Sequence, residues 1–258
     1  MKIQGIFDTH AHYDDAQFDA DREELLSALP ENGVCGVINC GCTVASSKAA
    51  LALSAAYPFM YCALGIHPEE LSGVTDADFT ALEPLYAQKK VVAVGEIGLD
   101  YHWDTVPHAV QIAAFERQIL LANNLHLPVI IHDREAHADT FALLRKHRPQ
   151  GVLHCFSGSA ELAKEALSLG LYIGLGGAVT FKNARKPVEV AAMLPKDRLL
   201  LETDCPYMAP VPFRGKRNDS SLIAFVAEKL AEVRGEDAQA LVDQCRANAM
   251  RLFQIEGE

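Results

Sequence analysis

Short apolar runs alternate along the chain with longer amphipathic stretches. Eight runs are rich in branched or large apolar residues and lie near Gly, Pro or Asn, as strands buried in a parallel sheet do. These runs span residues 3–7, 34–40, 59–66, 91–99, 127–132, 151–156, 171–177 and 198–202. Helical spacing of apolar residues covers 19–33, 44–57, 76–90, 108–125, 135–147, 159–170, 185–196, 220–235 and 236–253. The pattern predicts an α/β protein.

The order of these elements indicates one particular architecture. Eight strands, each followed by a helix, in a chain of 258 residues predict a (β/α)₈ TIM barrel, with residues 1–258 as a single domain. An open doubly wound sheet is the alternative, and it would show a glycine-rich phosphate loop after the first strand. The chain reads DTHAHYDD there instead, so we favour the barrel.

Polar side chains gather where the predicted strands end. In a barrel, the carboxyl ends of the strands converge on one mouth, where the chemistry takes place. Charged side chains are almost never fully buried unless they are paired, so packing does not explain them. The residues that share this rim are His10, His12, His67, Glu96, His132, His154, Glu202 and Asp204.

Two of these histidines lie two residues apart near the start of the chain. In an extended strand, side chains at i and i+2 point to the same face, so His10 and His12 aim at one point. Neutral imidazole is the commonest protein ligand for a metal ion. Taken alone, the pair could equally belong to a polar turn. The other histidines and acidic residues expected at the same rim indicate a metal site instead.

The rim holds too many donors for a single ion. Two divalent ions that share a carboxylate would clamp the attacking and leaving oxygens of a hydrolytic displacement. We expect Glu96 to bridge them, with His10, His12 and Asp204 on one ion and His132 and His154 on the other. Imidazole with carboxylate suits several ions, which leaves Mg, Mn and Zn open.

Two acidic residues after the last predicted strand have further expected roles. Asp204 can accept the proton of the attacking water, which makes it the expected general base beside the catalytic bridge Glu96. Glu202 either hydrogen-bonds a metal ligand or is a barrel-interior carboxylate satisfied by a lysine or arginine.

Several motifs together resemble the TatD family of metal-dependent hydrolases. They run from Asp8 to about Phe253 and read DTHAHYD, GIHP, VGEIGLDYH, PVIIHDREA, GVLHCFSGS, YIGLGGAVTFKNA, LLLETDCPYMAPVPFRGKRN and NAMRLF. The resemblance implies an amidohydrolase-like barrel with one or two divalent metals and deoxyribonuclease activity, in several members removal of nucleotides from 3′ ends. It implies the same ligands, and it adds His67 as a contact to substrate phosphate; the alternative is a loop residue ordered by Pro68.

The chain departs from the family pattern at two places. After RGKRN it reads Asp219, Ser220 and Ser221, where members commonly have an acidic residue and proline. The loop after the fourth strand has a bulky edge, and its Trp103 either stacks on a base or forms a hydrophobic lid.

Charge and cysteine content limit the partners and the compartment. The net charge of −11 argues against a nucleic acid held by the overall field. Seven scattered cysteines without a Cys-x-x-Cys pair, and no apolar stretch typical of a signal peptide or membrane span, predict reduced thiols in a cytoplasmic protein. No membrane or obligate protein partner is expected.

Local basic groups still allow a polyanionic substrate. Arg214, Lys216 and Arg217 follow the last strand, where barrels often bind phosphate, although a solvated face is the alternative. The leading hypothesis is a nuclease that hydrolyses phosphodiesters at single-stranded or frayed DNA ends. A hydrolase of carboxyl esters or amides, such as an aminoacyl-tRNA deacylase, is the second hypothesis. A metal-binding protein without turnover is the third, and the presence of Asp204 argues against it.

Overall fold

The strands form one parallel sheet that curls into a barrel. The computed structural model describes residues 2–103 and 105–256, and its sheet has the order β1-β2-β3-β4-β5-β6-β7-β8. The strands are β1 (Ile6–Ala11), β2 (Val34–Cys40), β3 (Met60–Leu64), β4 (Val91–Asp100), β5 (Val129–Arg134), β6 (Gly151–Leu153), β7 (Tyr172–Leu175) and β8 (Leu199–Leu201). This confirms the predicted (β/α)₈ barrel.

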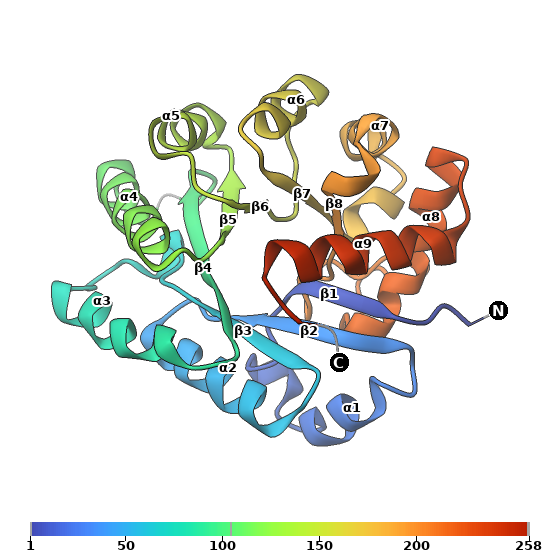
Figure 1. Cartoon of the computed structure of the whole chain (residues 1–258), viewed down its shortest axis with the longest axis horizontal. Helices are drawn as coiled ribbons and strands as arrows, with labels where there is room; N and C mark the ends of the chain where they lie inside the picture. Colours follow the sequence, from blue (N-terminus) through green and yellow to red (C-terminus); the bar gives the residue numbers. More distant parts are fainter. Residues whose placement is uncertain (1, 104, 257–258) are drawn as a thin grey trace.

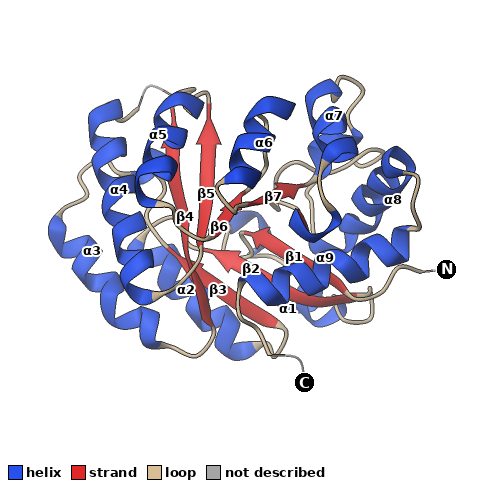
Figure 2. Ribbon diagram, turned by 45° about the horizontal axis from the view of Figure 1, so that its top comes forward, coloured by secondary structure: helices blue, strands red, loops and turns tan. Residues whose placement is uncertain are grey.

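Helices surround the sheet, as Figure 1 and Figure 2 show. In the described part of the chain they are α1 (Arg22–Ala28), α2 (Val44–Ala56), α3 (Asp76–Leu82), α4 (His108–Leu125), α5 (His137–His147), α6 (Ala160–Ser168), α7 (Arg185–Met193), α8 (Ile223–Arg234) and α9 (Ala238–Leu252). Side-chain caps fix several starts, because Thr43, Ser159 and Asp237 each accept a backbone N–H from the first turn of their helix. Within the described residues, no helix has both the length and the apolar character that crossing a membrane requires.

The interior of the barrel is filled by side chains from every strand. One buried cluster takes a residue from each of the eight strands: Phe7, Ile38, Ala63, Ala93, Ile130, Val152, Tyr172 and Leu200. Ala249 and Leu252 of α9, and Phe253 directly after it, join this cluster. Packed apolar side chains thus fill the interior of the barrel.

The first and last strands meet through scattered contacts rather than a regular ladder. An isolated bridge links Ala11 to Cys205, and the His12 amide donates to the Cys205 carbonyl at 2.8 Å. The Asp204 amide donates to the His10 carbonyl at 2.9 Å. The β1–β8 seam, as we call these contacts between residues 8–12 and 201–205, therefore lies at the carboxyl end of the barrel.

A buried carboxylate reinforces this seam. Asp8 accepts the backbone N–H of Thr203 at 3.0 Å and, on its other oxygen, the hydroxyls of Thr203 and Ser220 at 2.6 Å each. Burial raises the pKa of Asp8 to about 6, against these hydrogen bonds, which favour the ionised form. Ser220, in the stretch that departs from the family pattern, thus holds β1 and the segment after β8 together.

Candidate metal centre

Strand geometry directs the candidate ligands into the barrel mouth. Because side chains alternate along a strand, His132 faces the same side as interior residue Ile130, and His154 the same side as Val152. Asp204 lies beyond the end of β8 and has a left-handed backbone, so alternation does not place it. Two strand ends therefore present donors by simple period-two geometry.

The other ligands depend on irregular pairing. The register of β1 against β2 shifts between Asp8 and Ala11, and that of β4 against β5 shifts between Val94 and Ile97. Such shifts redirect side chains locally. They lie at His10 and Glu96, so the two strands bring these residues to the same mouth.

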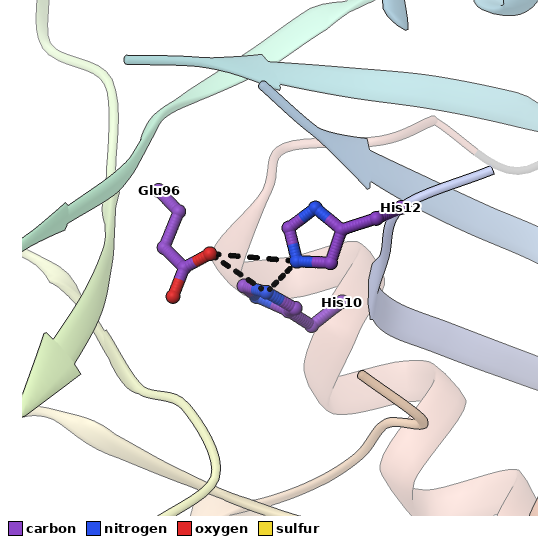
Figure 3. Close-up of side chains that lie close together, drawn as sticks. All are labelled: His10, His12 and Glu96. Carbon is purple, nitrogen blue, oxygen red and sulfur yellow. Dashed lines mark hydrogen bonds and ion pairs between the residues drawn. The ribbon is translucent and has the colours of Figure 1, made fainter. Parts of the chain in front are cut away.

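The histidine pair of the first strand converges on Glu96, as Figure 3 shows. The Nε2 atoms of His10 and His12 lie 3.0 Å apart. Glu96 Oε2 lies 3.3 Å from His10 Nε2 and 3.4 Å from His12 Nε2. Two imidazole nitrogens and a carboxylate oxygen thus share one small volume.

The second oxygen of Glu96 faces a second histidine pair. Oε1 lies 2.7 Å from His154 Nε2 and 3.0 Å from His132 Nδ1. Glu96, His132 and His154 each offer a ligand atom within 4.8 Å of the others, as do His10, His12 and Glu96. One carboxylate thus stands between two donor groups, which is the arrangement expected of a bridge.

Asp204 completes the arrangement from the β8 side. Its Oδ1 lies 3.4 Å from His12 Nε2 and 3.6 Å from His10 Nε2. The backbone at Asp204 is left-handed, with φ of 60°, a conformation that is uncommon outside glycine and that clusters at functional sites. Its side chain is 22% exposed, against 4% for Glu96, so Asp204 reaches both the donors and the solvent.

Both carboxylates are held ionised. Burial acts to raise the pKa of Glu96, but the neighbouring histidines, His154 foremost, hold that pKa well below its usual range. Burial also acts against ionised Asp204, whose pKa the surrounding histidines nevertheless lower. Ionised oxygens are the form that binds a cation.

The histidines differ in their protonation. Burial, followed by repulsion from His154, lowers the pKa of His10 to about 4, which leaves this imidazole neutral. Burial would also lower the pKa of His132, but hydrogen bonds with Asp100 and Glu96 raise it to about 10. The proton on His132 therefore balances the negative charge of the nearby carboxylates, a role that a bound metal cation would take over.

The chemistry of the donor set fits divalent ions. Two imidazole nitrogens that face each other at 3.0 Å satisfy one another only if a proton or a cation lies between them. The Nδ1 atom of buried His154 has no hydrogen-bond partner among the described residues. Four imidazoles and two ionised carboxylates around one bridge are the ligands that Zn, Mn and similar ions accept.

Sequence reasoning missed two contacts that orient the donors. Buried Asp100 lies 2.9 Å from His132 Nε2, and the Cys40 carbonyl lies 3.0 Å from His12 Nδ1. Oxygen acceptors behind metal-binding histidines fix the tautomer and the ring orientation. Asp100 stands within the quoted motif GEIGLDYH, but no spacing rule singles it out.

His67 lies deeper in the site than a peripheral substrate contact would. It begins the short 3₁₀ helix η2 (Pro68–Glu70), and its Nδ1 accepts the N–H of Glu69 at 3.2 Å. Its Nε2 lies 3.4 Å from Glu96 Oε1. With Glu69 and His132 it forms a third group of donors within 4.8 Å of one another. Glu69 was not expected from the sequence.

Glu202 is buried at the end of β8, but the expected hydrogen bond to a candidate metal ligand is not among the contacts of the described residues. Its Oε1 accepts the backbone N–H of Cys155, and burial raises the pKa of Glu202 to about 8. Its Oε2 has no hydrogen-bond partner among the described residues. The ion pairs of the described chain include none between Glu202 and a lysine or arginine, so the alternative of a salt-bridged carboxylate finds no support.

The three basic residues after β8 differ in their surroundings. Arg217 pairs with Asp21 at 2.6 Å, and the Gln17 carbonyl accepts a further hydrogen bond from it. Arg214 lies over the ring of Phe181 at 4.3 Å, while Lys216 is exposed. Among the described residues, Arg214 and Lys216 have no such ion pair.

The donors open into a pocket of about 700 Å³, which is within the usual range for ligand sites. Tyr207 and Met208 line it and also line the neighbouring pocket that holds Arg214 and Lys216. Tyr207 and Met208 therefore connect the pocket of the candidate donors with the pocket that holds Arg214 and Lys216.

Known proteins are similar to this chain in sequence and in architecture. A family model described as TatD related DNase matches residues 7–254. The Bacillus subtilis (strain 168) protein named uncharacterized metal-dependent hydrolase YabD is 42% identical over 253 residues, covering 97% of this chain and 99% of that protein. The Cronobacter sakazakii protein named 3′-5′ ssDNA/RNA exonuclease TatD is 37% identical, covering 96% of this chain and 97% of its own length.

A solved structure extends the agreement to three dimensions. The crystal structure of YjjV, a TatD homologue from Escherichia coli K12, matches with a TM-score of 0.92 at 36% identity and covers 97% of this chain and 98% of its own. The family model, the relatives and the shared barrel agree on one classification and on chemistry at ester bonds. The chain belongs to the TatD family of metal-dependent hydrolases.

Proposed function

We propose that this hydrolase removes nucleotides from the ends of single-stranded DNA or RNA with the help of two divalent ions. The observation that carries the proposal is Glu96, which directs Oε2 to His10 and His12 and Oε1 to His132 and His154. A shared carboxylate of this kind suits a pair of ions that acts on both sides of a phosphodiester.

The ligands divide between two positions. His10, His12 and Asp204 would hold one ion and His132 and His154 the other, with Glu96 placed to serve both positions. Mg, Mn or Zn bound there would polarise the phosphoryl group and lower the pKa of water. The chain's own contribution is a fixed set of donors, since most of these side chains are buried.

Asp204 is the proposed general base. Its carboxylate is ionised, it contacts the histidine pair, and it is more exposed than Glu96. The proton of the attacking water passes to an Asp204 oxygen as the new bond to phosphorus forms and the bond to the leaving oxygen breaks. Protonated Asp204 then returns this proton to the leaving oxygen, directly or through water in the open pocket.

Substrate recognition rests on local charge. His67 contacts the scissile phosphate from the η2 side, and Arg214 and Lys216 bind phosphates further along the strand. The relative from Cronobacter sakazakii, named as an exonuclease on ssDNA and RNA, supports a nucleic acid substrate.

A substrate panel tests the proposal. Purified protein is assayed with Mg, Mn or Zn against a 5′-labelled oligonucleotide, a chromogenic phosphomonoester, a chromogenic carboxyl ester, an amide and an aminoacylated tRNA. We expect a ladder of products that shortens from the 3′ end, with Glu96→Gln as the inactive control. Turnover of the carboxyl ester, the amide or the aminoacyl bond, with an intact oligonucleotide, would replace this proposal by the carboxyl or amide hydrolase.

A further inference from the structure

An aromatic ring and a guanidinium line the metal pocket on the side formed by the ends of β4 and β5. Trp103 follows β4 and is 48% exposed, although it belongs to the pocket lining together with His132. Arg134 ends β5 and lies over the indole, with its Cζ atom 5.5 Å from the ring centre. Part of the Trp103 ring is thus covered by Arg134, and about half of the side chain remains accessible.

One buried carboxylate ties this ring to the metal donors. Asp100 Oδ1 accepts the backbone N–H of His102 at 2.9 Å and of Trp103 at 3.1 Å, which closes the turn that carries the indole. Asp100 Oδ2 lies 2.9 Å from His132 Nε2. The position of Trp103 is therefore set relative to a metal ligand, a precision that a simple hydrophobic lid would not need.

The lining of the metal pocket is rich in carboxylates, and a guanidinium lies beside Trp103. Asp14, Asp15, Glu69 and Glu70 line the pocket and repel phosphate. Arg134 is the one lysine or arginine among the described residues that line this pocket. It makes no ion pair within residues 2–103 and 105–256, so its charge is available to a polyanion.

We propose that Trp103, backed by Arg134, stacks on the nucleobase next to the scissile phosphate. This rests on the proposed nuclease function and adds to it a recognition element for the base. Stacking on an aromatic side chain tolerates every base, because each has a π-face. The guanidinium behind the indole strengthens the stack through a cation–π contact. The consequence is a preference for strand ends that carry a base over abasic ends.

The expected size of this preference follows from measured stacking contributions. Loss of an aromatic platform costs a single-strand binding protein about 5- to 150-fold per base. We therefore expect kcat/KM for a normal 3′ end to exceed that for a 3′-terminal abasic residue by about this factor. In Trp103→Ala the ratio of the two values should fall to about one, whereas Trp103→Phe should retain part of it.

A binding measurement tests the stack without turnover. Trp103 is the single tryptophan of the chain, which also has seven tyrosines, so fluorescence excited selectively at tryptophan reports on this ring. We expect deoxyadenosine monophosphate, added with Mg, to quench the fluorescence with a saturating curve, and deoxyribose 5-phosphate to leave it unchanged. Arg134→Gln should shift the midpoint of quenching to a higher nucleotide concentration.

The outcomes separate the two proposals. Absence of quenching, together with equal losses of Trp103→Ala on normal and abasic ends, would overturn the stack and leave the nuclease in place. Saturable quenching by the nucleotide with no hydrolysis of any oligonucleotide would retain the base platform and reject the nuclease. Quenching by deoxyribose 5-phosphate to the same extent would show a phosphate effect and would also overturn the stack.

Discussion

The substitution Asp100→Asn tests how the second ion position is prepared. A carboxylate can only accept, so Asp100 keeps the proton of His132 on Nε2, 2.9 Å away. Nδ1 lies 3.0 Å from Glu96 Oε1, and it would offer its lone pair to a cation that displaces the second proton of His132. The native carboxylate thus selects the tautomer in which His132 would bind metal.

Asparagine reverses this selection. Its Oδ1 still accepts the amides of His102 and Trp103, which leaves the NH₂ group facing His132 Nε2. That nitrogen becomes an acceptor, the proton moves to Nδ1, and the ligand atom is blocked. Removing such an orienting contact typically weakens metal binding by about 10- to 100-fold, which corresponds to about 1.4–2.7 kcal/mol.

Equilibrium dialysis with elemental analysis measures the effect. At a Zn or Mn concentration that loads both positions in the native protein, we expect Asp100→Asn to retain about one ion per chain. Asp139→Asn is the matched control, because Asp139 accepts the nearby hydroxyl of Tyr101 at 2.7 Å but touches no ligand. Native metal content in Asp100→Asn, with an unchanged circular dichroism spectrum, would refute the tautomer argument.

Three further predictions concern the seam, the base and the basic loop. Asp8→Ala removes the acceptor of the His10 and Thr203 amides at about 1–3 kcal/mol each, while the Thr203 and Ser220 hydroxyls keep other partners. Thermal unfolding should therefore shift down by about 4–24 °C, and a shift under 3 °C would contradict this. Asp204→Asn should lower kcat by about 10²–10⁴-fold; more than half of the native rate at unchanged metal content would exclude it as the base. Single-strand affinity should fall with log[salt] at a slope of about −0.7 per bound phosphate. The double variant of Arg214→Ala and Lys216→Ala should flatten this slope and raise KM for an oligonucleotide. An unchanged slope would show that these two side chains are only solvent-exposed and bind no phosphate.

The architecture and the main donors were accessible from the sequence because both depend on short-range patterns. Apolar runs separated by amphipathic stretches predict the barrel, and its strand ends are places where function is expected. His132 and His154 follow interior residues by two positions, so alternation alone directs them inward. The limits of several elements differ: the expected run of residues 3–7 became Ile6–Ala11, and the helices expected over 19–33 and 76–90 shortened to Arg22–Ala28 and Asp76–Leu82. Pairing with β2 extends the strand through polar residues that no local propensity would include.

Other features depend on contacts between distant segments. The register shifts at His10 and Glu96 arise from pairing between strands, which sequence periodicity does not report. Asp100 gains its role from the position of a ring more than thirty residues further along. Arg217 pairs with Asp21 across 196 positions, so its charge is partly neutralised, although in the sequence it is indistinguishable from its basic neighbours.

The β1–β8 seam gives the bound ion a mechanical consequence. His10 and His12 stand on one side of the seam and Asp204 on the other, so an ion held by all three acts as a cross-link between the first and last strands. A ligand present at 100 times its Kd stabilises the folded chain by about 2.7 kcal/mol. An ion at this site would apply that stabilisation at the β1–β8 seam, where isolated hydrogen bonds join the first and last strands of the barrel. Removal of metal should therefore open the β1–β8 seam before the rest of the barrel. Amide hydrogen exchange at His12 and Asp204 should become faster, and proteolytic cleavage should occur earlier. The supply of metal would then set the lifetime of the protein as well as its rate.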